Sequence, residues 1–129
     1  MAANPLMSRE KIERLPNFVK RFGIRHGLRL GLGLANSGND VAAPARALMV
    51  PGLPAPLWLR PTRSDYSIFW QSFVKRQYDL HSFPQMAELL RRAEEYGAAG
   101  RVPVIVDGGG NIGFSLRSFA ADFPFAHVV

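Results

Sequence analysis

One short stretch, VIVDGGGNIGFS at residues 104–115, constrains the fold of this chain more than any other. The apolar, β-branched run Arg101–Val106 is typical of a buried strand, and an acidic residue, Asp107, follows it directly. Glycine has no β-carbon, so residues 108–110 permit a sharp turn and the close approach of a ligand. We therefore expect a strand, a glycine turn and a helix in succession.

This turn has the chemical features of a site for a nucleotide-type cofactor. A helix that starts after the turn presents unpaired N–H groups and the positive end of its dipole to an anion. In open parallel sheets, ligands bind at the carboxyl ends of the strands, which is where this turn would lie. The predicted cofactor-binding residues form one continuous run: Asp107, Gly108, Gly109, Gly110, Asn111, Ile112 and Gly113.

Two cofactor classes compete for this turn. The spacing Gly108-x-Gly110-x-x-Gly113 matches the dinucleotide fingerprint and alone favours NAD or FAD. However, the carboxylate of Asp107 would repel a pyrophosphate group at the same turn. It suits S-adenosylmethionine, which brings an ammonium group and whose own carboxylate can face backbone N–H donors. The charge favours the methyl donor, and a fragment of an NAD-dependent oxidoreductase is the alternative.

The same turn resembles the first motif of class I methyltransferases, acid-x-Gly-x-x-x-Gly, with Asp107, Gly109 and Gly113 at its fixed positions. Asn111 and the flanking apolar residues resemble the FkbM version of this motif, Asp-x-Gly-Ala-Asn-x-Gly. One departure is Gly110, which stands where the family usually has alanine. The resemblance therefore points to the FkbM-type methyltransferases.

A softer similarity to the same family lies upstream of the turn. It includes the stretch LWLRP at 57–61 and the stretch QYD at 77–79, so that the resemblance covers about residues 55–129. The family implies methyl transfer from S-adenosylmethionine to a hydroxyl group of a sugar, a glycolipid or a secondary metabolite. The partner that it implies is thus a small-molecule or glycan methyl acceptor.

The fold that this resemblance implies is α/β, the opening β-α-β of a Rossmann-like class I methyltransferase sheet. We expect a basic helical arm and linker at residues 1–45 and a partial methyltransferase domain at 46–129. Such folds carry an acidic residue for the cofactor's ribose about 20 residues past the glycine turn. That position falls beyond Val129, so we expect an incomplete sheet and the N-terminal part of a longer enzyme.

The hydrophobic period predicts the elements that precede this segment. They are a helix from Ser8 to Phe22 split at Pro16, a strand-like run at 28–34, a linker at 35–56, and a strand at 57–60. A helix capped by Ser64 or Asp65 then follows, with one apolar stripe made of Tyr66, Phe69, Trp70, Phe73 and Val74.

Further elements are predicted on either side of the glycine turn. Ser82 and Gln85 have the spacing of a capping box for a helix that ends at Gly97. The inward face of that helix would carry Met86, Leu89, Leu90, Ala93 and Tyr96. After the turn we expect a helix at 112–123 and a strand at 126–129.

Positive charge is concentrated at the start of the chain, whose formal net charge is +6. Residues 1–30 hold seven Lys and Arg against two Glu, whereas residues 31–129 hold nine against eight acidic residues. The arm could dock on an anionic surface or partner, or it could be a solvated helix face. A non-catalytic interaction protein that uses this arm is the third function hypothesis, and nucleic acid is not expected because exposed aromatics do not interleave the charges.

Residue types exclude several other chemistries. The chain has no Cys, which excludes disulfides, thiolate metal sites and a cysteine nucleophile. The three histidines, His26, His81 and His127, lack the paired spacing of metal ligands, so no metal is predicted. No apolar run reaches the ~18 residues of a membrane span, and we expect a cytoplasmic location. The sequence indicates no catalytic base, and methyl transfer can rely largely on positioning the acceptor.

Overall fold

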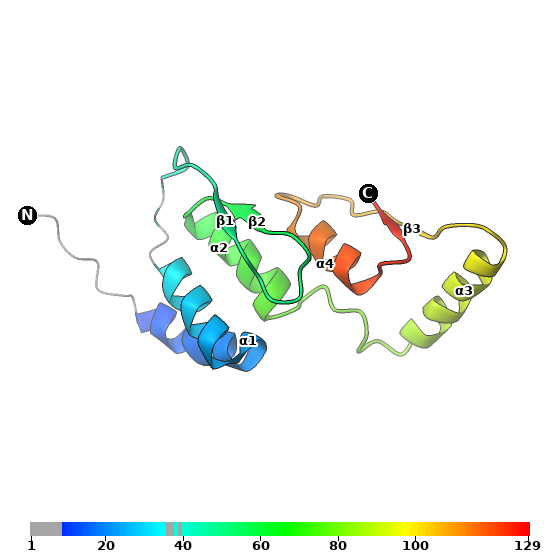
Figure 1. Ribbon diagram of the computed structural model, residues 1–129, viewed down its shortest axis with the longest axis horizontal. Helices are drawn as coiled ribbons and strands as arrows, with labels where there is room; N and C mark the ends of the chain where they lie inside the picture. The colour runs from blue at the N-terminus through cyan, green and yellow to red at the C-terminus, as the bar shows by residue number, and fades with distance from the viewer. Residues whose placement is uncertain (1–8, 36–37, 39) are drawn as a thin grey trace, which may run out of the picture. The chain divides into compact units, whose positions relative to one another are not determined.

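The computed structural model describes residues 9–35, 38 and 40–129, with the side chains of 9–11 and 35 left aside. Its elements are α1 (Arg9–Ala35), β1 (Arg46–Leu48), β2 (Leu57–Leu59), α2 (Arg63–Phe69), the π-helix η1 (Trp70–Val74), α3 (Met86–Ala98), β3 (Val104–Ile105), α4 (Phe114–Asp122) and β4 (His127–Val128) (Figure 1). The described chain is thus mixed α/β, with an antiparallel pair β1-β2 and a parallel pair β3-β4. The chain divides into two compact units, residues 1–74 and residues 75–129.

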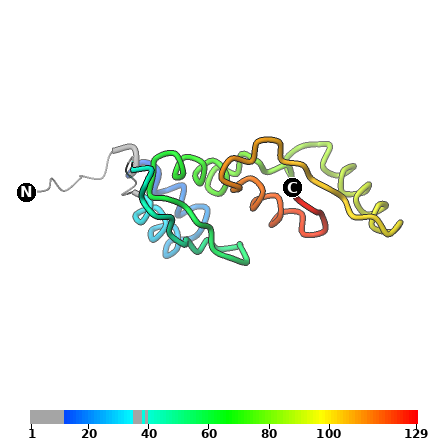
Figure 2. Tube along the Cα trace, turned by 90° about the horizontal axis from the view of Figure 1, so that it is seen from above, coloured from blue at the N-terminus to red at the C-terminus, as the bar shows by residue number. Residues whose placement is uncertain are grey.

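The helix α1 is a hairpin of two helical halves. Its break is at Gly23, whose φ of 76° and ψ of 168° are not helical, and the two halves run side by side (Figures 1 and 2). The predicted split at Pro16 is wrong, because Pro16 lies inside the first half. Proline keeps a helix-compatible φ, whereas glycine takes a positive φ without steric cost. The predicted start at Ser8 lies outside the described residues.

The second half of α1 replaces the strand predicted at 28–34, and that prediction is wrong. Leu30 and Leu34, four residues apart, are buried, while Leu28 and Leu32 are exposed. This is the period of a helix that buries one face. The alternating leucines therefore mark two faces of a helix and not the two faces of a strand.

Two glycines of α1 bring its halves into close contact. A β-carbon at Gly27 would lie 2.5 Å from the backbone oxygen of Phe18, and one at Gly31 would lie 2.6 Å from Cδ2 of Leu15. Real β-carbons essentially never come this close to other atoms. At Gly27 the nearest atoms belong to the backbone, so only glycine fits there, whereas at Gly31 the nearest atom is the end of the Leu15 side chain, which can move. The four-residue spacing aligns the two glycines on one side of the helix.

An aromatic cluster forms the core of the 1–74 unit. Phe18 of α1 and Phe69 of α2 are almost fully buried, and their rings stack with centroids 6.3 Å apart. Arg21 adds a hydrogen bond from its Nε to the backbone oxygen of Phe73, 3.1 Å away. The predicted apolar stripe of this region is confirmed as core, with Tyr66, Phe69, Phe73 and Val74 buried and Trp70 half-buried. The N-cap of α2 is Thr62, not Ser64 or Asp65, because the Thr62 hydroxyl accepts from the backbone N–H of Asp65.

The stretch predicted as a linker, residues 35–56, contains a strand. Residues 46–48 form β1, which pairs antiparallel with β2 so that Ala47 lies opposite Trp58. The predicted strand at 57–60 is confirmed as β2. The predicted domain limits, 1–45 and 46–129, stay a prediction.

The 75–129 unit contains the expected β-α-β order. β3 and β4 are parallel, with Ile105 opposite Val128, and α4 connects them. The ladder continues past the strands, because the backbone N–H of Val129 donates to Ile105 at 2.9 Å and that of Asp107 donates to Val129 at 2.7 Å. The succession of strand, turn, helix and parallel strand is confirmed, but the strands are shorter than predicted. The prediction of a buried strand at 101–106 is wrong, because Val104 and Val106 are 59% and 74% exposed: no further strand covers this two-stranded sheet in the described chain.

The helix α3 buries only its first residue, Met86. Leu89 and Tyr96, predicted to face inward, are 50% and 45% exposed. The predicted capping box is wrong, because Gln85 is the N-cap and makes no side-chain capping bond. Ion pairs line the solvent side, where Glu88 accepts from Arg91 and Arg92, and these hydrogen bonds lower the pKa of Glu88 to about 2.

The position at which α3 ends can be tested by substitution of the glycines at its C-terminus. The helix runs to Ala98, and Gly100, with a φ of +69°, donates its N–H to the oxygen of Gly97. The predicted end at Gly97 is therefore one residue early, and the glycine with positive φ that follows the helix is Gly100. We expect Gly100→Ala to destabilise the helix by about 1 kcal/mol, and Gly97→Ala to stabilise it by a similar amount. Urea unfolding followed by far-UV circular dichroism measures both, and a change of the same sign for the two substitutions would contradict this end of α3.

Within the described ranges, no helix combines the length and the apolar character needed to cross a membrane.

Candidate functional site

The glycine turn lies between β3 and α4, at the carboxyl end of β3. Three of its residues have positive φ: Gly109 at 110°, Asn111 at 47° and Gly113 at 82°. The N–H of Gly113 donates to the oxygen of Gly110 at 2.7 Å and closes the turn. Asparagine is one of the few residues with a side chain that tolerates this conformation, so the backbone alone accounts for Asn111.

Asp107, the acidic residue of the turn, is half-buried and has one occupied carboxylate oxygen. Its Oδ2 accepts a hydrogen bond from the hydroxyl of Ser115, a buried residue in the first turn of α4. Its Oδ1 makes no hydrogen bond within the described part of the chain. The carboxylate thus connects the end of β3 to the start of α4 and keeps one oxygen available for a ligand.

The three consecutive glycines have different surroundings. A β-carbon at Gly110 would lie 3.0 Å from Oδ2 of Asp107 and 3.3 Å from Cδ1 of Leu116, which is tighter than most real contacts. Glycine at this position, where the FkbM motif has alanine, leaves room for the carboxylate in its conformation bound to Ser115. Gly108 and Gly109 have no atom within 4 Å of where a β-carbon would lie, so this side of the turn is open to a ligand.

The start of α4 adds a positive end to the site. Gly113 is its N-cap and supplies no side-chain hydrogen bond to the first turn of this nine-residue helix. Ile112, another of the predicted site residues, is half-buried beside it. The structure therefore brings together, in one turn, a carboxylate, open glycine backbone and a helix N-terminus without a side-chain cap.

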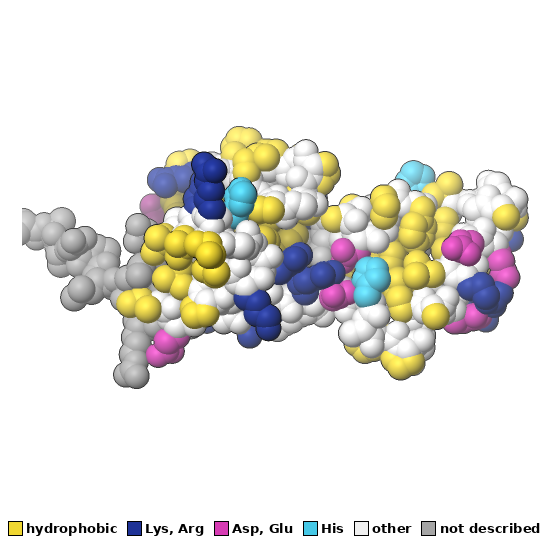
Figure 3. All heavy atoms as spheres, turned by 60° about the horizontal axis from the view of Figure 1, so that its bottom comes forward, with side chains coloured by type: hydrophobic (Ala, Val, Ile, Leu, Met, Phe, Trp, Pro, Cys, Tyr) yellow, Lys and Arg dark blue, Asp and Glu magenta, His cyan; other side chains and the backbone are white. Residues whose placement is uncertain are grey.

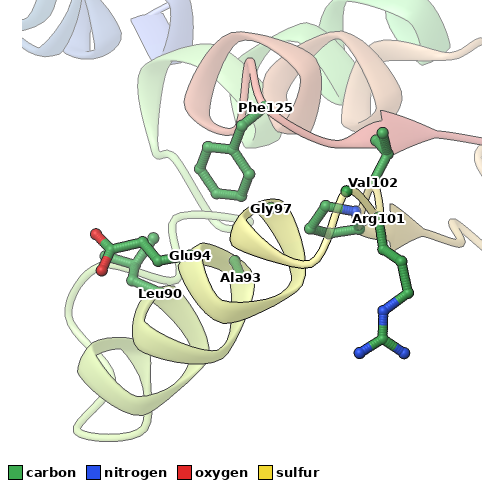
Figure 4. A pocket seen from close by; sticks show the side chains of 9 residues that line it. Leu90, Ala93, Glu94, Gly97, Arg101, Val102 and Phe125 are labelled. Atoms are coloured by element: carbon green, nitrogen blue, oxygen red, sulfur yellow. The ribbon is translucent and has the colours of Figure 1, made fainter.

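A hollow of the 75–129 unit lies away from the glycine turn. It has a volume of about 600 Å³, and Leu90 and Ala93 of α3 face Phe125 across it (Figure 4). Its other lining residues include Val102 and Pro103, which precede β3, so it lies at the amino ends of the strands. None of residues 107–113 lines this hollow.

Known proteins give no identification of this site. Comparison with protein families, with curated proteins and with solved structures found no match to the chain. Any proposal about family, cofactor or activity therefore depends on the residues of the turn.

The structure also forms a cluster that spacing along the sequence did not indicate. Ligand-type atoms of Asp79, His81 and Asp122 lie within 4.8 Å of one another. Nη2 of Arg76 lies 3.0 Å from Oδ2 of Asp79 and 3.6 Å from Oδ1 of Asp122, so a cation of the chain itself already balances this charge. Hydrogen bonds from His81, together with the charge of Arg76, lower the pKa of Asp79. The cluster connects the loop before α3 to the end of α4.

Proposed function

We propose that the glycine turn binds S-adenosylmethionine and that the chain is part of a methyltransferase of the FkbM type with a Rossmann-like sheet. One observation carries this proposal: the carboxylate of Asp107 ends β3 beside the N-terminus of α4, with Oδ1 free of hydrogen bonds in the described chain. An amino acid zwitterion matches this pair of charges. Its ammonium would face Asp107, and its carboxylate would face the first N–H groups of α4.

The same geometry argues against a dinucleotide. A pyrophosphate at the start of α4 would come close to the carboxylate of Asp107, which Ser115 holds in place. Two like charges about 4 Å apart repel each other by about 4 kcal/mol at an effective dielectric constant of 20. The repulsion outweighs the match of Gly108, Gly110 and Gly113 to the dinucleotide fingerprint.

The cofactor, when bound, supplies an activated methyl group. The described residues of the turn would bind and orient it, and positioning of the acceptor can supply much of the rate acceleration. A hydroxyl of a sugar, a glycolipid or a secondary metabolite remains the proposed acceptor on the ground of the FkbM resemblance alone.

Calorimetry with the full chain tests the proposal. We expect S-adenosylhomocysteine to bind and NADH not to bind. Asp107→Asn removes the charge but can still accept from Ser115, and Gly108→Val fills the open side of the turn without a positive φ. Each should weaken S-adenosylhomocysteine by at least about tenfold, which corresponds to ~1.4 kcal/mol. Asp40→Asn removes an exposed carboxylate in the other unit and is the matched control.

Two outcomes would overturn the methyltransferase proposal. Tighter binding of NADH than of S-adenosylhomocysteine would favour the oxidoreductase. Binding of neither ligand, together with unchanged properties of Asp107→Asn, would favour an interaction protein that uses its basic N-terminal part.

A further inference from the structure

The whole excess of positive charge belongs to one unit of the chain. Residues 1–74 contain ten Lys and Arg against four Asp and Glu, whereas residues 75–129 contain six of each. No acidic residue lies between Glu13 and Asp40, a range that includes the second half of α1. An anionic partner would therefore be attracted to the 1–74 unit and, within it, to α1.

The second half of α1 has an apolar stripe that packs against nothing described. Ile24, Leu28 and Leu32 are 72%, 40% and 45% exposed, and their four-residue spacing places them on one face. The neighbouring face of the same helix, with Leu30 and Leu34, already provides the contact with the rest of the unit. The exposed stripe is thus a second apolar face, on which no described residue of this unit packs.

Basic side chains border this stripe. Arg25 and Arg29 each follow a stripe residue by one position, which places both along one side of the stripe, and both are exposed. Figure 3 shows hydrophobic side chains gathered over α1, with Lys and Arg side chains near them. Arg29 and Met49 both line a hollow of about 270 Å³, and Met49 is 60% exposed. The apolar and basic surface therefore extends from the helix to the loop after β1.

We propose that residues 24–35 of α1 attach the chain to an anionic lipid surface. Ile24, Leu28 and Leu32 would enter the boundary between headgroups and acyl chains, to a depth of about 5–10 Å, as amphipathic interfacial helices do. Arg25 and Arg29 would contact the negative headgroups. The helix lies on the bilayer and does not cross it.

The chemistry of the surface favours lipid over other anionic partners. Single-stranded nucleic acid is bound by aromatic side chains between basic ones, and this stripe is aliphatic. A second copy that paired through the same face would bring Arg25 and Arg29 against the same positive charges, with no acidic residue in the second half of α1 to offset them. Anionic lipid matches both the charge and the aliphatic stripe.

Sedimentation with lipid vesicles tests this proposal on the full chain. We expect binding to vesicles of phosphatidylcholine mixed with phosphatidylglycerol, and none to phosphatidylcholine alone. Leu28→Gln with Leu32→Gln should weaken binding by at least about tenfold. Arg25→Gln with Arg29→Gln should weaken it by about fivefold for each charge, and about 1 M salt should act in the same direction.

Matched controls use exposed residues outside the stripe. Leu89→Gln removes a leucine of similar exposure from α3, and Arg63→Gln removes an exposed charge from α2, so neither should change vesicle binding. Unchanged binding of the Leu28 and Leu32 double variant would overturn the proposal, as would absence of binding to anionic vesicles. Two other results would overturn the lipid proposal. One is a chain that self-associates and becomes monomeric when Leu28 and Leu32 are replaced. The other is a chain that binds DNA or an acidic protein but does not bind vesicles.

Discussion

Replacement of Gly27 by alanine is expected to destabilise the 1–74 unit by about 1–3 kcal/mol, the usual cost of an overpacked contact. The added β-carbon would meet the backbone oxygen of Phe18 at 2.5 Å and Cα of Val19 at 2.6 Å. Backbone atoms cannot turn aside as the end of a side chain can, so the two halves of α1 must separate. This separation outweighs the gain in helix propensity from alanine, which is at most about 1 kcal/mol.

Gly33→Ala is the matched control for this substitution. Gly33 lies in the same half of α1, and no atom lies within 4 Å of where its β-carbon would be. Alanine should therefore stabilise the unit here by about 0.5–1 kcal/mol. The two tryptophans of the chain, Trp58 and Trp70, both belong to the 1–74 unit, so urea unfolding followed by tryptophan fluorescence reports on this unit alone. A stabilising effect of Gly27→Ala would show that the halves do not pack through this glycine.

This hairpin explains why sequence reasoning failed at residues 28–34. Leucines at every second position also include pairs four residues apart, such as Leu30 and Leu34, so the pattern fits both a strand and a helix. The deciding contact joins Gly27 to Phe18, in another part of α1, and no local propensity contains it. The same limit applies to Gly23, where the break depends on how the two halves pack.

The β-α-β segment was predictable because its signals are local. The apolar run before Asp107, the glycines and the apolar period of residues 112–123 each indicate one element without knowledge of its neighbours. The parallel pairing of β3 with β4 then follows from the intervening helix, since such crossovers join parallel strands.

Local signals did not give the contacts inside the candidate site. The bond from Ser115 to Asp107 spans eight residues and requires a turn with positive φ at Gly109, Asn111 and Gly113. The sequence identified residues 107–113 as a set, but it did not identify Ser115 as the partner of Asp107. The cluster of Asp79 with Asp122 depends on tertiary contact in the same way.

Replacement of Asp65 by alanine is the other large effect that we expect. Its carboxylate, in a residue only 3% exposed, accepts from the backbone N–H of Arg60 at 2.9 Å, from the guanidinium of Arg60 at 3.0 Å and from the hydroxyl of Thr62 at 3.2 Å. Asp65→Ala would leave these donors without their acceptor at the start of α2. We expect a loss of about 2–4 kcal/mol in the stability of the 1–74 unit, because unpaired polar groups and broken ion pairs are costly when buried.

The charge of Asp65 also predicts how this unit responds to acid. Burial raises the pKa of Asp65, but the hydrogen bonds from Arg60 and Thr62 lower it more, so the pKa lies below its ordinary value of 3.8. The folded pKa is below the unfolded one, so the charged carboxylate stabilises the fold fully at any pH above the unfolded pKa. This stabilisation is lost as the pH falls from the unfolded pKa through the folded pKa. Asp65→Asn should therefore lower stability at neutral pH and make it less dependent on pH below about 4.

The measurement is urea unfolding followed by tryptophan fluorescence, repeated from neutral pH to about pH 3. Asp79 and Glu88 also have lowered pKa values, but they belong to the other unit. The fluorescence therefore reports the contribution of Asp65 to stability separately from theirs. The control is Asp40→Asn, which removes an exposed carboxylate from the same unit. The same loss of stability in acid for Asp65→Asn as for the original chain would contradict this role. In that case the contacts at Asp65 would act through hydrogen-bond geometry, which asparagine can partly keep, and not through the charge that Arg60 balances.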